Sequence, residues 1–188
     1  MVKIVLASES PRRRQLMELA GVDFEVIVSN VDETVSGGLP DEQVRELALR
    51  KAEAVRSTLH EAAIVIGADT LVYIDGCVLG KPEDADDAFR MLKMLSGNVH
   101  EVYTGVAILR GEESLVFSDV TRVFFRELSH EEIWAYIETG EPLDKAGSYG
   151  VQERGAVLVD RVEGDFYTVV GLPIAKVCAA LRVFGGRL

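Results

Sequence analysis

The run Val2-Lys3-Ile4-Val5-Leu6-Ala7-Ser8-Glu9-Ser10-Pro11-Arg12-Arg13-Arg14 indicates how the fold begins. Its apolar part, Val2 to Ala7, is typical of a buried strand. Ser10 and Pro11 then have the pattern of a helix N-cap followed by proline at the first helical position. Backbone N–H groups at the positive end of that helix, beside the arginines, would form an anion site suited to phosphate. The alternative is a capped helix with a solvated basic first turn, although arginine is unfavourable at this end of a helix dipole.

Length and composition favour an ordinary globular protein. The chain has 188 residues, of which 48% are hydrophobic and 27% charged. This predicts one domain over residues 1–188, and leaves open an arrangement of two lobes around a central cleft. The net charge of −11 argues against nucleic acid and membrane as partners, because both attract a basic face.

Cysteine usage and hydropathy suggest a compartment. Cys77 and Cys178 have no metal-ligand spacing and form no disulfide framework, which favours a reduced, cytoplasmic setting. The apolar start is too short for a signal peptide. Charged residues interrupt the apolar run from Val169 to Phe184, so we expect no membrane span there.

Helical and strand patterns alternate along the chain, and this predicts an α/β fold with a mixed twisted sheet flanked by helices. We expect strands at Val2–Ala7, Phe24–Val28, Ala63–Ile66 (ended by Gly67), Glu101–Leu109, Leu115–Phe125 and Val157–Val162, and a hairpin at Leu71–Leu79. We expect helices from Pro11 to Ala20, and at Asp41–Leu59, Asp84–Leu95, His130–Glu138 and Pro173–Phe184. Residues Gly140 to Gly155 form a predicted long functional loop.

Lys51 is the most informative single residue. The predicted helix Asp41–Leu59 carries an apolar stripe, and Lys51 falls inside it, four residues after Leu47 and four before Val55. A lysine at such a position either extends its charged end to the edge of the stripe or meets an anion in a cleft. Arg50, off the stripe, is expected to be solvated.

Two acidic residues are candidates for chemistry. Asp69 follows the buried strand that is expected to end at Gly67, and a carboxylate at a strand end can be a metal ligand or a general base. Its bland alternative is a turn cap. Glu33 lies in a polar loop and could supply a second carboxylate, or be an exposed loop acid.

Several basic and polar residues lie in predicted loops. Lys81 stands between glycine and proline, which would hold it in place, although an ordinary turn lysine has the same pattern. Asp144, Lys145 and Gln152 lie in the predicted long loop. The charged pair Asp144 and Lys145 could have a functional role there or could equally form a local salt bridge. The histidines show no ligand spacing, and Tyr136 fits helix packing. P-loop, dinucleotide-binding and serine-hydrolase motifs are absent from the sequence.

Taken in order, these segments resemble the Maf family of nucleoside triphosphate pyrophosphatases over nearly the whole chain. The matching segments are Leu6–Arg13, Asn30–Glu33, Gly67–Thr70, Gly80–Pro82, Ser96–His100, Tyr103–Gly105, Gly140–Gly147, Tyr149–Gln152 and Val170–Pro173. The resemblance implies a Maf/Ham1 fold like that of inosine triphosphatases, a homodimer, and a divalent cation (Mg²⁺, Mn²⁺ or Co²⁺). It also implies hydrolysis of a nucleoside triphosphate substrate to the monophosphate and pyrophosphate.

The resemblance also implies residue roles. Asp69 would activate water, or bind the metal together with Glu33. Further residues would hold the phosphates: Ser8, Arg12, Arg13, Lys51 and Lys81. Clustered cations and a metal neutralise charge around the α-phosphorus, as such chemistry requires.

Within that family, substrate choice follows the positions that here are Arg12, Thr70 and Gln152. This combination resembles the branch that prefers dTTP and UTP, with modified pyrimidine triphosphates as further candidates and nucleotide-pool house-cleaning as the role. The branch acting on 7-methyl-GTP carries other residues there. Glu153 and Thr168 depart from the family pattern, which usually has glycine and asparagine. A regulator of cell division that binds nucleotide with little turnover is the alternative outside enzymes.

Overall fold

The computed structural model describes residues 2–35, 37–60 and 62–186, which form two compact units. The first unit draws on residues 1–69, 104–119 and 171–188, and the second on residues 70–103 and 120–170. Single helices and strands follow the order that the sequence predicts. No helix among the described residues is long and apolar enough to cross a bilayer.

The strands of the described residues are β1 (Lys3–Ala7), β2 (Glu25–Val26), β3 (Ala63–Ile74), β4 (Cys77–Leu79), β5 (Val99–Arg110), β6 (Glu113–Phe125) and β7 (Val159–Glu163). They form one seven-stranded sheet in the order β2-β1-β3-β5-β6-β7, with β4 paired to β3. β1 runs parallel to β2 and β3, whereas β3–β4 and β6–β7 are antiparallel. The predicted mixed sheet is therefore confirmed.

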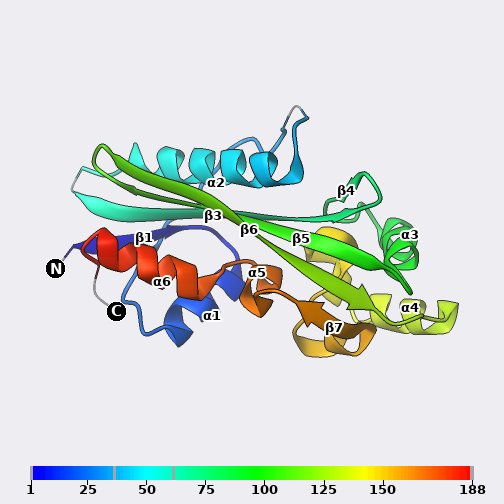
Figure 1. Cartoon of the computed structure of the whole chain (residues 1–188). Coiled ribbons are helices and arrows are strands. Elements are labelled where there is room, and N and C mark those ends of the chain that lie inside the picture. The colour runs from blue at the N-terminus through cyan, green and yellow to red at the C-terminus, as the bar shows by residue number, and fades with distance from the viewer. Residues whose placement is uncertain (1, 36, 61, 187–188) are drawn as a thin grey trace. The chain divides into compact units, whose positions relative to one another are not determined.

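The helices are α1 (Pro11–Leu19), α2 (Pro40–Arg56), α3 (Ala85–Leu95), α4 (His130–Ile137), α5 (Phe166–Val170) and α6 (Ile174–Val183). In the first unit, α2 covers one face of β1 and β3, and α1 and α6 lie on the opposite face (Figure 1). Side chains alternate accordingly, so that Val5, Ala7 and Val65 pack in one cluster with Ala48 and Ala52 of α2. Five helices were predicted, and α5 was missed.

Local signals explain several element boundaries. The side chain of Ser129 accepts the N–H of Glu132, and the Glu132 carboxylate accepts that of Ser129, so the two residues form a capping box at the start of α4. The Asp84 side chain caps α3 by accepting the N–H of Asp87 at 2.8 Å. The predicted long loop instead contains three short 3₁₀ turns: η1 (Glu141–Asp144), η2 (Ala146–Ser148) and η3 (Glu153–Leu158).

The expectation that a strand ends at Gly67 is wrong. β3 continues without interruption from Ala63 to Ile74, and Gly67 lies inside it. A Cβ atom at Gly67 would lie 2.2 Å from the carbonyl oxygen of Ala48 and 2.8 Å from the backbone nitrogen of Ala52. This glycine therefore allows close approach of a helix rather than ending a strand.

Candidate functional site

The position of α2 on the sheet brings the first functional pair together. Gly105 of β5 has the same role as Gly67, because a Cβ atom at Gly105 would lie 2.2 Å from the carbonyl oxygen of Val44 in α2. Two glycines thus let the backbone of α2 contact the sheet. Residues 63, 65, 67 and 69 of β3 point to the same face because side chains alternate along a strand. Asp69 therefore faces the helix, and it lies within the strand rather than at its end as predicted.

Lys51 reaches Asp69 across this short gap. Its Nζ atom lies 2.6 Å from Oδ1 of Asp69 and 2.7 Å from Oε1 of Glu33. The side chains of Lys51 and Asp69 are 9% and 13% exposed, whereas that of Glu33 is 60% exposed. The ammonium group therefore meets carboxylates on the buried face of α2 and does not extend to solvent. Sequence reasoning favoured neither alternative, and the structure selects the anion.

Glu33 is held in place by a turn and by an arginine of α2. The N–H of Thr34 donates to Oδ1 of Asp32 at 2.8 Å. Hydrogen bonds from the side chain of Thr34 and then from its backbone hold the pKa of Asp32 below its ordinary value. Nη1 of Arg50 donates to the carbonyl oxygen of Thr34 at 3.0 Å. The side chain of Arg50 is 37% exposed, in line with the expected solvation, and it also ties the Glu33 loop to α2.

Ser8 and Arg13 form a second polar group in the first unit. β1 ends at Ala7, which pairs with Gly67, so Ser8 leaves the sheet beside the strand that carries Asp69. Nη1 of Arg13 donates to Oγ of Ser8 at 3.2 Å, and its Nε donates to the carbonyl oxygen of Gly171 at 2.8 Å. Burial lowers the pKa of Arg13, and the nearby Asp69 carboxylate opposes that effect. Arg13 is buried, so the solvated basic first turn does not describe it.

The predicted cap of α1 is correct in position and wrong in chemistry. Ser10 is the N-cap residue and Pro11 begins the helix, but the Ser10 side chain makes no capping hydrogen bond. Instead, the N–H of Ser10 donates to Oγ of Ser8 at 3.2 Å. Arg12 is half-buried on the first turn. Its predicted contact with phosphate stays a prediction.

The donor set fits a divalent cation held jointly with substrate. The described residues contain no cluster of three or more histidine, cysteine or acidic side chains able to bind a metal ion. The carboxylates of Glu33 and Asp69 nevertheless both contact Nζ of Lys51, so the two lie close enough together to bind a single cation. Mg²⁺ is commonly bound by one or two carboxylates together with substrate phosphates.

Thr70, Lys81 and Gln152 belong to the second unit. Lys81 is exposed directly after β4, and the N–H of Gly147 donates to the carbonyl oxygen of Gly80 at 3.0 Å, which fixes the preceding backbone. Gln152 is half-buried, and its amide makes no hydrogen bond within the part of the chain that the structure describes. That these residues share a site with Asp69 stays a prediction.

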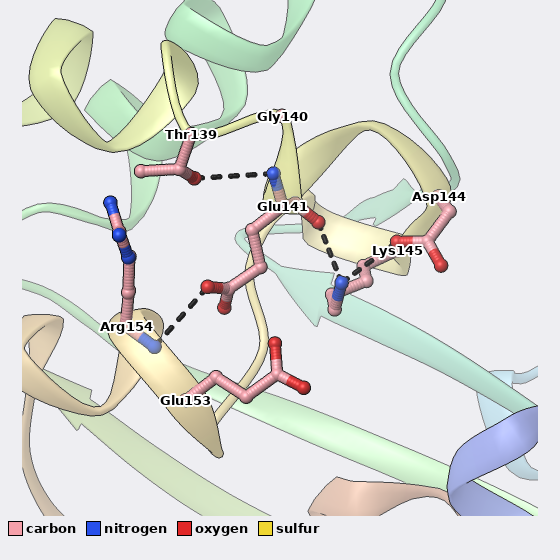
Figure 2. A pocket seen from close by; sticks show the side chains of 7 residues that line it. All are labelled: Thr139, Gly140, Glu141, Asp144, Lys145, Glu153 and Arg154. Carbon is pink, nitrogen blue, oxygen red and sulfur yellow. Dashed lines mark hydrogen bonds and ion pairs between the residues drawn. The ribbon is translucent and has the colours of Figure 1, made fainter.

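A polar pocket in the second unit was not predicted (Figure 2). Its volume is about 560 Å³, and it is lined by Thr139, Gly140, Glu141, Asp144, Lys145, Glu153 and Arg154. Nζ of Lys145 contacts Oδ1 of Asp144 at 2.8 Å and the carbonyl oxygen of Glu141 at 2.6 Å. The local salt bridge, one of the two interpretations of this pair, is thus present.

Comparison with known proteins identifies the family. The family model described as "Maf-like protein" matches residues 3–184. The chain belongs to the Maf family. A protein of Bacillus cytotoxicus named dTTP/UTP pyrophosphatase is 55% identical over 185 residues, which cover 98% of this chain and 96% of that protein. One of the same name from Thermoanaerobacter sp. strain X514 is 53% identical over 190 residues and the full length of both chains.

A solved structure supports the fold. The structure of a HAM1 protein from Coxiella burnetii has a TM-score of 0.53 to this chain at 15% identity, covering 97% of this chain and 100% of that one. The expected Maf/Ham1 fold is therefore confirmed. One departure from the Maf pattern now has a structural consequence: Glu153, where glycine is expected, has a φ of +56°. Glycine adopts such a backbone freely, and glutamate does not.

Proposed function

We propose that this Maf protein hydrolyses dTTP and UTP to the nucleoside monophosphate and pyrophosphate. The observation that carries the proposal is the buried ammonium of Lys51 between Asp69 and Glu33, in a chain whose full-length relatives are named dTTP/UTP pyrophosphatase. Modified pyrimidine triphosphates are further candidate substrates. The role would be removal of surplus or damaged nucleotides from the pool.

Asp69 is the proposed proton acceptor. Its Oδ1 is engaged by Lys51, and its Oδ2 makes no hydrogen bond within the described ranges, so Oδ2 is available to a water molecule. A water that loses its proton to Oδ2 attacks the α-phosphorus, and the bond to the bridging oxygen of the pyrophosphate breaks. General-base assistance of this kind typically contributes about 10²- to 10⁴-fold.

The cations bind the triphosphate. Lys51, Arg12 and Lys81 are the proposed phosphate ligands, and clustered positive charge stabilises the additional charge that develops on the leaving pyrophosphate. Arg13 stays a proposed phosphate ligand, and its guanidinium also contacts Ser8 and the carbonyl oxygen of Gly171. We assign to it the further role of holding Ser8 and the turn before α6, with Ser8 facing the phosphates.

Glu33 is the proposed metal ligand, and binding of the metal by Asp69 is the alternative to its role as proton acceptor. A bound Mg²⁺, Mn²⁺ or Co²⁺ would polarise the phosphoryl oxygens and offset their charge. Base selection is assigned to Arg12, Thr70 and Gln152, because a glutamine amide offers one donor and one acceptor to a pyrimidine edge.

The proposal extends to setting and assembly. Cys77 and Cys178 are free thiols, and Cys77 is exposed, which suits a reducing cytoplasm. A homodimer is expected from the family resemblance, and light scattering of the purified chain would test it.

Pyrophosphate release from a panel of nucleotides tests the function. The panel holds dTTP, UTP, CTP, GTP, ATP and 7-methyl-GTP, each with magnesium, manganese, cobalt or no metal. We expect metal-dependent release that is fastest with dTTP and UTP. Fastest release from another nucleotide would contradict the assigned base selection. Nucleotide binding without release from any of them would favour the regulator of cell division.

A further inference from the structure

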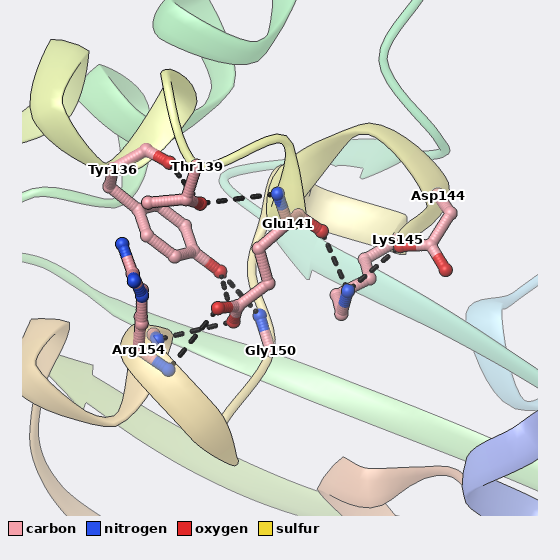
Figure 3. A network of polar contacts seen from close by, with 8 residues as sticks. Tyr136, Thr139, Glu141, Asp144, Lys145, Gly150 and Arg154 are labelled. Carbon is pink, nitrogen blue, oxygen red and sulfur yellow. Dashed lines mark hydrogen bonds and ion pairs between the residues drawn. The ribbon is translucent and has the colours of Figure 1, made fainter.

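The side chains of Glu141 and Tyr136 join the two ends of the short loop that carries Gln152 (Figure 3). Oε1 of Glu141 accepts from the Tyr136 hydroxyl at 2.8 Å and from the N–H of Gly155 at 3.2 Å. Its Oε2 accepts from the N–H of Arg154 at 3.2 Å. The Tyr136 hydroxyl in turn accepts from the N–H of Gly150 at 3.1 Å. One carboxylate and one phenol thus bind backbone at both ends of residues 150–155.

Close packing confirms that the loop is tightly closed. A Cβ atom at Gly155 would lie 2.0 Å from the carbonyl oxygen of Gly150 and 2.8 Å from the Tyr136 hydroxyl. At Gly150 it would lie 2.9 Å from Cε of Lys145 and 3.3 Å from Oε1 of Glu141. Gly155 therefore needs glycine, because a backbone carbonyl and the Tyr136 hydroxyl already fill the space, whereas at Gly150 the flexible end of Lys145 would have to move.

The Tyr136 hydroxyl of the clamp keeps its proton. Burial raises the pKa of Tyr136 above its ordinary value, so the hydroxyl remains a donor to Glu141 at neutral pH. Glu141 is itself positioned by the Thr139 hydroxyl, which accepts its N–H at 3.2 Å, and by Lys145, which donates to its carbonyl oxygen. The carboxylate can accept several hydrogen bonds at once, which a neutral amide at the same place cannot do equally.

We propose that Glu141 and Tyr136 are positioning residues for base selection, acting through Gln152. The inference rests on the proposed function, in which the Gln152 amide recognises the pyrimidine. Gln152 stands between the two clamped ends, followed by Glu153 in the left-handed region. The side-chain amide of Gln152 can select one base only if the backbone that carries it is fixed. In a mobile loop the amide donor and acceptor could reorient to pair with other bases as well. The closed loop supplies that fixed backbone.

The test compares Glu141→Gln and Tyr136→Phe with the matched control Asp144→Asn. Asp144 is a carboxylate of the same pocket, and its Oδ1 accepts from Nζ of Lys145 at 2.8 Å. The readouts are kcat and KM for UTP and CTP, and hydrogen exchange of the amides of residues 150–155. We expect faster exchange and at least about a 5-fold fall in the UTP-over-CTP ratio of kcat/KM in both clamp variants, mainly through KM, which is about 1 kcal/mol of discrimination. Asp144→Asn should leave the ratio within about 2-fold.

A Gln152→Ala background separates positioning from a general loss of stability. There, Glu141→Gln should change the ratio no further, because the amide on which the clamp acts is gone. Faster exchange with an unchanged ratio in the clamp variants would overturn the proposal, as would unchanged exchange. Should Glu141→Gln fail to fold, Tyr136→Phe decides alone. A wild-type protein that hydrolyses no pyrimidine triphosphate would instead refute the proposed function, and exchange at residues 150–155 would then judge the clamp by itself.

Discussion

Lys51 of α2 and Asp69 of β3 form a 2.6 Å ion pair in which both side chains are largely buried. The pair exists because two glycines let the helix backbone rest directly on the sheet, so that a short aspartate reaches a lysine on the helix's buried face. Glu33, from a loop outside both elements, completes the contact at 2.7 Å. This relationship underlies the catalytic proposal and the first three predictions.

Asp69→Asn should keep the fold and lose turnover. The amide retains the shape of the side chain but cannot accept the proton of the attacking water, so pyrophosphate release should fall by about 10²- to 10⁴-fold. Nucleotide affinity, measured by calorimetry, should change little. Asp119→Asn, which breaks a 2.7 Å ion pair with Lys176 in the same unit, is the control and should keep its turnover. Near-wild-type turnover in Asp69→Asn would remove Asp69 from the mechanism.

Lys51→Met should lower the free energy of unfolding by about 1–3 kcal/mol, because it leaves the largely buried Asp69 carboxylate without its cation. Adding Asp69→Asn should restore most of that loss, since the unpaired charge is then gone. Urea unfolding of the single and double variants at neutral pH measures both values. Additive losses in the double variant would show that the two side chains do not stabilise each other.

Gly67→Ala and Gly105→Ala should each cost about 2 kcal/mol or more, because a methyl group would overlap the α2 backbone, which must then move. The displacement would also separate Lys51 from Asp69, so turnover should fall in parallel. Gly80→Ala is the control for stability: nothing lies within 4 Å of a Cβ atom there. It should change the midpoint of thermal unfolding by far less, and equal shifts in all three would contradict the packing argument.

Glu153→Gly should stabilise the protein by about 1 kcal/mol, since glycine relieves the left-handed backbone conformation. Glu153→Ala keeps the Cβ atom and should bring almost none of that gain. Chemical denaturation of the two variants separates backbone strain from loss of the charge. A gain of equal size in both variants would assign the effect to the carboxylate instead.

Stability should decline in acid partly through His100. This ring is buried between Phe125 and Tyr149, its Nε2 lies 2.7 Å from the Tyr149 hydroxyl, and burial lowers its pKa to about 3. In the unfolded chain His100 binds a proton near pH 6.5, whereas in the folded chain it stays neutral until about pH 3. The free energy of unfolding therefore falls as the pH drops from 6.5 toward 3. Between pH 7 and 4.5 the loss from this group is about 2–3 kcal/mol.

His100→Gln should show a shallower decline over the same range, because glutamine does not titrate. Urea unfolding of both proteins at several pH values measures the difference. Parallel curves would show that His100 does not contribute to the pH dependence.

Sequence reasoning predicted elements better than contacts. Strand and helix patterns and the hairpin expected at Leu71–Leu79 are local signals, and each is found in the structure. The prediction at Gly67 was wrong because a glycine can either end a strand or let another backbone pack closely against it. Only the position of α2 on the sheet distinguishes these two roles. Lys51 within an apolar stripe was a real signal, but the stripe alone left extension to solvent and contact with an anion equally open, and only the position of Asp69 decides between them.

Other site features had no local signal at all. Arg50 was judged by its helix face, yet it contacts a loop that folds back from earlier in the chain. Tyr136 was assigned to packing, and Glu141 was noted only as part of a family motif. Their joint clamp depends on backbone amides 14 residues further along the chain, beyond the reach of a local spacing pattern.

Hydrolysis of UTP in ¹⁸O-labelled water, with mass analysis of both products, tests the central claim most directly. Attack of water on the α-phosphorus predicts the label in UMP and none in pyrophosphate. Label in the pyrophosphate would place the attack at the β-phosphorus and contradict the proposed mechanism, and release of labelled orthophosphate would contradict the pyrophosphatase assignment itself.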